Sequence, residues 1–374
     1  MPMKIALVTG SFLPTIGGAE FVVHHLAVQW MRQGHKVVVI NFTADQPAHP
    51  DASYRVRKYT LLPGATRFGY HRFPFQWHAV RTLKKLLREY KPDFISAHFG
   101  YPVGLWMARI RPVPRYLITC HGQDLTKLEQ GYRHEHAIDT HLRDALNSSG
   151  GAVAISTYAR KLMEDMGVRP SVILDIPNGV DVERFQKKVP RNLREQLSLP
   201  EDALIILSVG RNNPAKDYAT GIQAFAAISA TFPSAYYVII GAGTSTLMPL
   251  SQELGIAGKL VCSEGLFGED LIAAYQQADI LFSPSIRELC PLVVLEGMAA
   301  GLPAVVTNVS GSQDLIRTGY NGIVVEPRQP AMMAEALRQM IEDKGLRRAC
   351  CAANRDMAAD YDWSIISKKY LEHA

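Results

Sequence analysis

The feature that most constrains the fold is a repeated unit, in which a short continuous apolar run precedes a loop rich in Gly, Pro or Ser and then a helical stretch. In the first unit, the apolar run 4–9 is followed by the glycine-rich segment 10–20, a helix from about 19 to 33, and a second run at 36–41. Apolar runs without alternation are typical of strands that helices cover on both faces of a parallel sheet. The pattern therefore predicts an α/β fold built from βαβ units.

The chain is long enough for two such domains, since 374 residues correspond to two domains of ordinary size. Residues 43–75 are polar and are expected to be irregular, and the charged segment 183–202 is expected to be a linker. Helices are expected over about 330–360 and 363–373. Further strands are expected at 93–97, 115–119, 152–155, 172–176, 203–209, 235–240, 260–262, 280–282, 304–306 and 322–325.

Composition favours a cytoplasmic protein. The five cysteines include no Cys-x-x-Cys pair, which argues for reduced thiols rather than a disulfide framework or a zinc site. The first apolar run is too short for a signal peptide, and no apolar stretch reaches the length of a membrane span. Residues 360–362 read Asp-Tyr-Asp, but they lie in the C-terminal helical region rather than at a strand end, so no metal site is predicted.

Positive charge is concentrated in the first half. Residues 1–178 carry 22 Lys and Arg against 13 Asp and Glu, whereas the remainder carries 18 against 22, which gives net charges of +9 and −4. A basic, aromatic segment spans 67–88, with a helix expected from 76 to 90. Such a segment suits peripheral contact with an anionic membrane at its inner face. A helix with a solvated basic face is the commoner explanation, and no nucleic-acid partner is expected.

Residues 278–303 hold the densest group of candidate residues. An apolar strand end at 280–282 leads into a Pro-Ser loop that carries Glu288, and a helix is expected from Pro291, since proline suits the first helical position. Glu296 lies inside that helix, which Gly301 ends. Free amides and partial positive charge at a helix N-terminus attract phosphate, and nearby carboxylates accept paired sugar hydroxyls. The segment therefore suits a phosphorylated ligand rich in hydroxyl groups.

Three other strand ends carry candidate residues. His121 and Asp124 follow the run 115–119, at the sheet edge where open α/β sheets bind ligands. A capping histidine and an N-cap aspartate are the structural alternatives. Arg211 and Lys216 follow the run 203–209 and place two cations between a strand end and a helix start. Glycines at 241 and 243 form only half of a dinucleotide fingerprint, so NAD binding is not predicted.

The segment 284–303 also carries a family resemblance. It is similar to the signature of the retaining glycosyltransferases of family 4, which have the GT-B fold: two Rossmann-like, doubly wound parallel-sheet domains that face each other across a cleft. The resemblance implies an acceptor-binding domain at 1–178, a nucleotide-sugar domain at 179–360, and a C-terminal helix at 361–374 that crosses back to the first domain. The matching residues are Pro284-Ser285-x-x-Glu288-x-x-x-Leu292-x-x-x-Glu296-x-Met298-Ala299-x-Gly301-x-Pro303.

The resemblance assigns roles to individual residues. Two positions depart from the family pattern: Asp217 stands where a glycine usually follows the lysine, and Pro291 stands where glycine is frequent. The implied catalytic residues are His121, Arg211, Lys216 and Glu288. The implied substrate-binding residues are Gly17, Gly18, Asp124, Asn178, Gly265, Leu289, Cys290, Leu292 and Glu296.

The resulting hypothesis is transfer of a hexosyl group, with retention, from a nucleotide-diphosphate sugar to an acceptor hydroxyl of a glycan or lipid-linked acceptor, in polysaccharide or glycolipid synthesis. UDP is the expected base, and neither a metal nor a cofactor is expected, because cations and amides would stabilise the leaving diphosphate. The hypothesis requires Lys216 and Glu288 to share one site. A nucleotide-sugar epimerase or a phosphorylase on the same fold, and a non-catalytic nucleotide-sugar-binding protein, are the alternatives.

Overall fold

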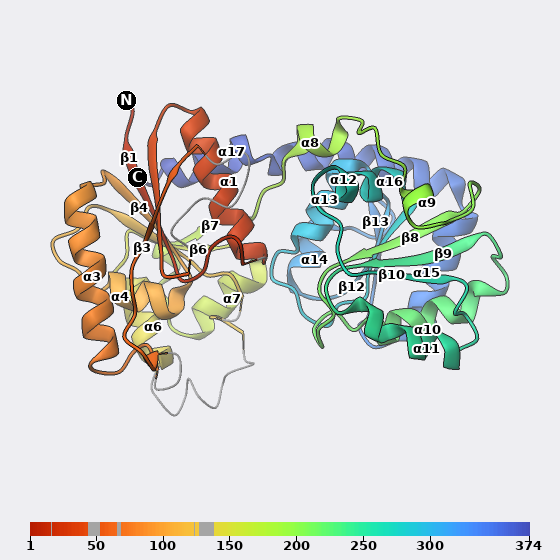
Figure 1. The fold of residues 1–374 in the computed structure, drawn as a ribbon, viewed down its shortest axis with the longest axis horizontal. Coiled ribbons are helices and arrows are strands. Elements are labelled where there is room, and N and C mark those ends of the chain that lie inside the picture. The colour runs from red at the N-terminus through yellow and green to blue at the C-terminus, as the bar shows by residue number, and fades with distance from the viewer. Residues whose placement is uncertain (16, 44–52, 66–68, 123, 127–137) are drawn as a thin grey trace. The chain divides into compact units, whose positions relative to one another are not determined.

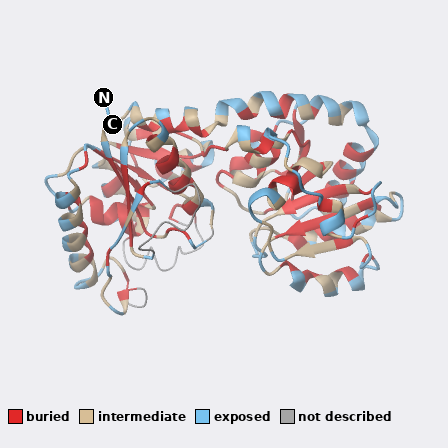
Figure 2. Ribbon diagram, turned by 45° about the horizontal axis from the view of Figure 1, so that its top comes forward, coloured by how far each residue is buried: buried red, intermediate tan, exposed pale blue. Residues whose placement is uncertain are grey.

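The computed structural model describes residues 1–374 apart from residue 16 and residues 44–52, 66–68, 123 and 127–137 (Figure 1). The chain divides into two compact units, each a parallel sheet covered by helices. The first unit comprises Met1–Asn178 together with Trp363–Ala374, and the second comprises Gly179–Asp362. Most strands are buried and the outer faces of the helices are exposed (Figure 2), as the continuous apolar runs of the sequence predict.

The sheet of the first unit has seven strands in the order β3-β2-β1-β4-β5-β6-β7, and neighbouring strands run parallel. The strand order reverses between β1 and β4, and at such a switch point open α/β sheets bind ligands beyond the carboxyl ends of the strands. The strands are β1 (Lys4–Thr9), β2 (Lys36–Asn41), β3 (Arg55–Lys58), β4 (Phe94–His98), β5 (Tyr116–Thr119), β6 (Gly151–Ala154) and β7 (Ile173–Asp175).

The last helix of the chain completes the first unit. It packs on α1, where the Trp30 indole N–H donates to the Ser367 carbonyl at 3.0 Å and the rings of His25 and Trp363 stack 5.4 Å apart. Trp30 and Trp363 are both fully buried, so this helix belongs to the core of the first unit. The helices are α1 (Gly18–Arg32), α3 (Phe75–Tyr90), η1 (Gly100–Gly104), α4 (Leu105–Met107), α6 (Ile138–Asn147), α7 (Thr157–Asp165), η3 (Pro170–Val172) and α17 (Trp363–Leu371).

The second unit repeats the plan with six parallel strands in the order β10-β9-β8-β11-β12-β13, and its switch point lies between β8 and β11. An aromatic group formed by Phe225, Tyr237 and Phe282 lies in its core. The strands are β8 (Leu204–Val209), β9 (Ala235–Ile240), β10 (Leu260–Ser263), β11 (Ile280–Ser283), β12 (Ala304–Thr307) and β13 (Gly322–Val325). The helices are α8 (Val182–Gln186), α9 (Leu193–Gln196), α10 (Tyr218–Ser229), η4 (Thr244–Leu247), α11 (Met248–Glu253), α12 (Gly268–Gln277), α13 (Leu292–Ala300), α14 (Ser310–Leu315), α15 (Pro330–Glu342), α16 (Lys344–Ala358) and η5 (Ala359–Tyr361).

The structure corrects three expectations. Residues 43–75 are not wholly irregular, because β3 pairs with β2 as an edge strand whose mostly exposed side chains leave no apolar run to signal it. The expected linker contains the short helices α8 and α9. The expected helix 330–360 is broken at Asp343, whose carboxylate accepts the Leu346 amide at 2.8 Å and so begins α16.

Among the described helices, none combines the length and the apolar character needed to cross a bilayer.

Candidate functional site

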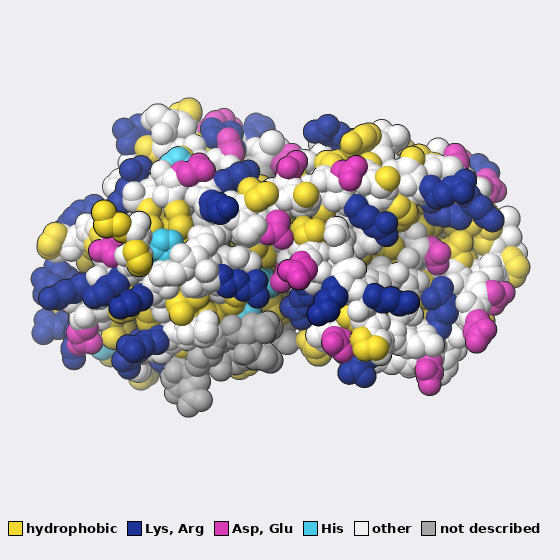
Figure 3. Space-filling view, turned by 90° about the horizontal axis from the view of Figure 1, so that it is seen from above, with side chains coloured by type: hydrophobic (Ala, Val, Ile, Leu, Met, Phe, Trp, Pro, Cys, Tyr) yellow, Lys and Arg dark blue, Asp and Glu magenta, His cyan; other side chains and the backbone are white. Residues whose placement is uncertain are grey.

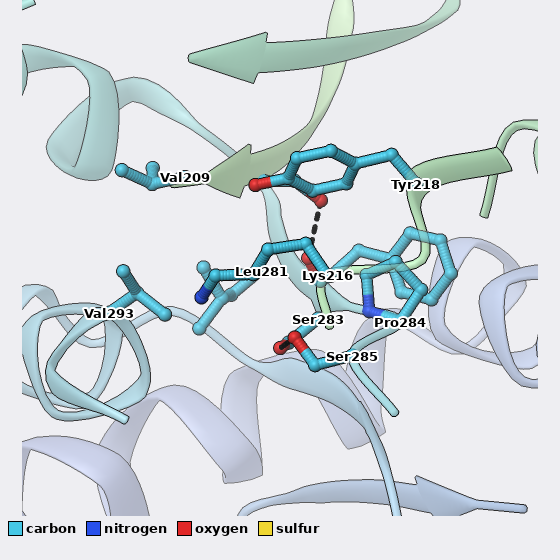
Figure 4. A pocket seen from close by; sticks show the side chains of 10 residues that line it. Val209, Lys216, Tyr218, Leu281, Ser283, Pro284, Ser285 and Val293 are labelled. Atoms are coloured by element: carbon cyan, nitrogen blue, oxygen red, sulfur yellow. Dashed lines mark hydrogen bonds between the residues drawn. The ribbon is translucent and has the colours of Figure 1, made fainter. Parts of the chain in front are cut away.

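The loops that follow β8 and β11 build the principal site of the second unit. Because these two strands flank the switch point, their carboxyl ends bring the two loops side by side. The Ile286 amide donates to the Ala215 carbonyl at 2.8 Å, which joins the loops through their backbones. Lys216 and Ser285 line the pocket between the loops, together with Tyr218 from the start of α10 (Figure 4).

Lys216 and Glu288 meet in this site. Lys216 Nζ donates to Glu288 Oε1 at 2.8 Å, and the Ser285 hydroxyl donates to the same oxygen at 3.0 Å. The two charged side chains are only 17% and 16% exposed, so water screens them less than a surface pair. The structure therefore places in one site the two residues that the sequence hypothesis requires to share one.

The backbone around Lys216 explains the departure at Asp217. Asp217 precedes α10 with φ 46° and ψ 42°, a left-handed conformation that glycine adopts without strain and aspartate adopts at a cost. The loop therefore keeps the geometry that a glycine would provide. Gly210 has a separate reason to be glycine, because a Cβ there would lie 2.8 Å from Lys216 Cε.

Arg211 takes no part in this ion pair. It is exposed in the loop after β8, and within the described residues its guanidinium has neither a hydrogen bond nor an ion pair. Gly265 follows β10, where Glu264 fixes the neighbouring loop by accepting the amides of Gly243 and Ser245 at 2.6 and 3.0 Å. Within the part of the chain that the structure describes, neither Arg211 nor Gly265 forms a hydrogen bond or ion pair with the side chain of Lys216 or Glu288.

The remaining predicted residues of this unit lie in helix α13 or directly before it, next to the loop that follows β11. Pro291 is not its first residue, as the sequence suggested, but its N-cap, with ψ 112°. Leu289 and Cys290, both buried, precede the cap, and Leu292 opens the helix. Leu292 is the first helical residue, so its amide has no acceptor inside the helix. The amide is therefore free to bind an anion at this N-terminus.

Glu296 lies one turn further along α13, and it is bonded rather than solvated. The hydroxyl of Tyr275, a residue of α12, donates to Glu296 Oε2 at 2.5 Å. Burial raises the pKa of Glu296 to about 7, against the opposing effects of the Tyr275 hydrogen bond and of the charges of Arg184 and Lys216. The sequence pattern missed Tyr275, because a tyrosine in an apolar helix looks like any core residue.

In the first unit, His121 belongs to a buried polar chain at the carboxyl ends of β4 and β5. One ring nitrogen of His121, Nε2, lies 2.9 Å from Nδ1 of His98, whose Nε2 lies 3.0 Å from the hydroxyl of Ser96. Burial lowers the pKa of His121 to about 3, and burial followed by the charge of His121 lowers that of His98. Both rings are therefore neutral near pH 7, and one donates its N–H to the other.

Asp124 organises the loop that carries His121. Its Oδ1 accepts the amides of His121 and Gly122 at 3.0 and 2.9 Å, and its Oδ2 accepts the Gly100 amide at 2.7 Å. The carboxylate is buried, and both of its oxygens accept hydrogen bonds from backbone amides. His98, by contrast, escaped the sequence analysis, although its place at the end of a strand was a usable signal.

The other predicted residues of the first unit lie at element boundaries. Gly17 is the N-cap of α1 and Gly18 is its first residue, at the carboxyl end of β1. Asn178 is buried, and it is the residue at which the chain leaves the first unit for the second. Parts of the segments 43–75 and 125–140 fall outside the described residues. The described residues hold no group of three or more His, Cys, Asp or Glu that could bind a metal ion.

Two family models match the chain, one over each half. The model for group 1 glycosyl transferases matches residues 190–357, and that for glycosyltransferase family 4 matches residues 16–184. An uncharacterized glycosyltransferase of Methanocaldococcus jannaschii is 29% identical over 392 residues, which cover 98% of this chain and 96% of the relative.

Two further similarities cover different parts of the chain. A D-inositol 3-phosphate glycosyltransferase of Geodermatophilus obscurus is 33% identical over 216 residues, or 55% of this chain, and the match spans only 47% of that relative. Among solved structures, Anabaena Alr3699/HepE in complex with UDP-glucose has a TM-score of 0.79 at 19% identity, over 99% of this chain and 98% of that one. At that identity the likeness shows the fold, with two Rossmann-like domains.

Proposed function

Because this chain belongs to the family 4 type of glycosyltransferases with the GT-B fold, we propose that it moves a hexosyl group from a UDP-sugar to a hydroxyl of a glycan or lipid-linked acceptor. Transfer proceeds with retention at the anomeric carbon. UDP is the proposed nucleotide, and the similar fold of Anabaena Alr3699/HepE, which was solved with UDP-glucose bound, supports that choice.

The observation that carries the proposal is the Lys216–Glu288 ion pair beside the N-terminus of α13. Departure of a nucleoside diphosphate requires positive charge where negative charge develops. Lys216 and the amides at the start of α13 would supply that charge, and Arg211 would join them when the diphosphate arrives. The ion pair would then open, which frees the Glu288 carboxylate to accept sugar hydroxyls.

The nucleoside and the sugar have their own candidate residues. The Glu296 carboxylate, fixed by the Tyr275 hydroxyl, would accept the two ribose hydroxyls. His121 would bond the transferred sugar, and its neutral ring suits a hydrogen bond better than ionic contact with the diphosphate. Within the described residues no side chain stands out as the nucleophile of a double displacement. The proposed route to retention is therefore a single step, in which the acceptor hydroxyl attacks the anomeric carbon from the same face that the diphosphate leaves.

Donor binding provides the first test. Calorimetry with UDP-glucose, GDP-glucose and ADP-glucose should give the tightest binding for UDP-glucose, and Glu296→Gln should weaken it. Lys161→Met is a matched control, because it removes an exposed lysine from an i,i+4 pair with Asp165 on α7 of the first unit. Equal binding of all three donors, or none, would contradict the proposed nucleotide.

Transfer provides the second test. Incubation of UDP-glucose with a panel of alkyl glycosides should yield a product whose linkage has the anomeric configuration of the donor by NMR, and EDTA should leave the rate unchanged. An inverted product would refute retention, and loss of activity with EDTA would refute metal independence. Epimerised donor without acceptor would instead identify an epimerase, and a requirement for inorganic phosphate would identify a phosphorylase.

A further inference from the structure

A second polar cavity lies at the opposite edge of the sheet in the second unit. Its volume is about 340 Å³, and it is bounded by the residues that precede β11 and β12 and by helix α16. Lys216 and Glu288 follow the carboxyl ends of their strands, whereas Asp279 and Gly301 precede the amino ends of theirs. This cavity, called the α16 pocket below, is therefore distinct from the donor site.

Four cations of α16 line the α16 pocket. Arg347, Arg348 and Arg355 follow Lys344 by three, four and eleven residues, so the four side chains share one face of the helix. One carboxylate, that of Asp279, also lines it, and its Oδ2 accepts the Ile205 amide at 2.8 Å. Figure 3 shows the resulting group of Lys and Arg side chains over the second unit.

Some basic residues of the unit, such as Arg191 and Arg338, are paired with carboxylates. Within the described residues none of the four cations of α16 forms an ion pair, and only Arg347 has a side-chain hydrogen bond, to the carbonyls at the end of α15. Arg338 on the preceding helix is paired with both Glu335 and Glu342. Four cations gathered around a hollow with a single carboxylate repel one another, and an anion in the hollow would relieve that repulsion.

The pocket is built on a fixed floor. The Arg355 side chain lies against Gly301, the C-cap of α13, whose φ of 80° favours glycine. The neighbouring Asn354 is fully buried, and its amide donates to the Leu302 and Asn321 carbonyls at 2.6 and 2.9 Å. These bonds hold α16 in one register against the loop before β12.

We propose that the α16 pocket binds the phosphate group of a small phosphorylated molecule. Arginine and lysine are the side chains that proteins use for phosphate, and guanidinium groups bind its oxygens in pairs. A volume of about 340 Å³ lies in the range of small-molecule pockets. A soluble phosphate ester and the headgroup of an anionic lipid share this chemistry, and the experiment separates them.

The test uses the full chain carrying Lys216→Met, which weakens phosphate binding at the proposed donor site. Calorimetry with inorganic phosphate, pyrophosphate and ribose 5-phosphate should show binding that weakens as salt is added. Adding Lys344→Gln and Arg348→Gln, both at exposed positions, should weaken it at least tenfold, whereas Arg338→Gln as the matched control should not change it. Circular dichroism verifies that each variant is folded.

The source of the phosphate is resolved by sedimentation with phosphatidylglycerol vesicles. Binding of the soluble phosphates that depends on Lys344 and Arg348 supports a free phosphorylated ligand. Sedimentation with vesicles that depends on the same two residues, without binding of the soluble probes, supports a lipid headgroup. If neither probe binds, or if the double substitution changes nothing, the proposal is overturned. All of these outcomes are independent of glycosyl transfer.

Discussion

The Lys216–Glu288 pair allows stability and catalysis to be separated by a double-mutant cycle. Lys216→Met removes the ammonium group and keeps most of the apolar stem, whereas Glu288→Gln removes the negative charge and keeps the shape. If the pair only holds the two loops together, the double variant should recover what each single variant loses. If the two groups act on the donor, the double variant should recover stability but not activity.

The distance sets the magnitude. At 2.8 Å and an effective dielectric constant of about 20, the attraction between the two charges is about 6 kcal/mol, most of which the cost of removing them from water offsets. Lys216→Met leaves Glu288 with the Ser285 hydroxyl as donor, so we expect a loss of about 1–3 kcal/mol in the free energy of unfolding. The coupling energy between the two substitutions should be about 1–2 kcal/mol.

Urea unfolding measures the stability terms, and transfer from UDP-glucose measures catalysis. Each single variant should lose roughly 100- to 1,000-fold in the rate of transfer, as expected for one missing charge-stabilising group. The exposed Lys161–Asp165 pair, treated in the same way, should show a coupling of a few tenths of a kcal/mol and no loss of transfer. Recovery of transfer in the Lys216–Glu288 double variant would refute the catalytic assignment.

Three further predictions concern single residues. Burial raises the pKa of Glu296 to about 7, so its folded-state contribution to stability is present below about pH 4.5 and lost as the pH rises through 7. Binding of UDP-glucose, whose phosphates do not titrate in this range, should strengthen from pH 6 to 8 by calorimetry in the wild type but not in Glu296→Gln. His98→Phe removes a hydrogen bond to His121, which should slow transfer about tenfold without changing donor affinity. Asp217→Gly should raise the melting temperature by about 2–4 °C, since it relieves a left-handed aspartate, and an unchanged value in a thermal scan would contradict that reasoning.

The sequence predicted those features that depend on local order along the chain. Continuous apolar runs predicted the buried strands, because a strand covered on both faces has no polar side to show. Lys216 and Glu288 could be paired in advance because each follows a strand, and parallel strands end at one edge. Strand β3 was missed for the converse reason, since an edge strand with exposed side chains carries no apolar run.

Features that depend on contacts between distant segments could not be predicted in this way. Tyr275 reaches Glu296 from another helix, and His98 reaches His121 from the neighbouring strand. Nothing in the local pattern around Tyr275 indicates its partner, and the strand end at His98 indicates the sheet edge but not the contact with His121. The cations of α16 show the same limit, because basic residues spaced along a helix predict a solvated face. Only the loops before β11 and β12 turn that face into the wall of a pocket.

Helix α13 has one of the two proposed sites of the second unit at each of its ends. Its N-terminus, at Leu292, presents free amides and partial positive charge to the donor site, so few side-chain cations are needed there. Its C-terminus, at Ala300 and Gly301, lies beside the α16 pocket and contributes partial negative charge. That negative charge would oppose a phosphate in the pocket, which would have to be held by side chains alone. This requirement agrees with the number of cations at each end of α13. Four cations line the α16 pocket at its C-terminus, whereas only Lys216 and Arg211 are assigned to the N-terminal end.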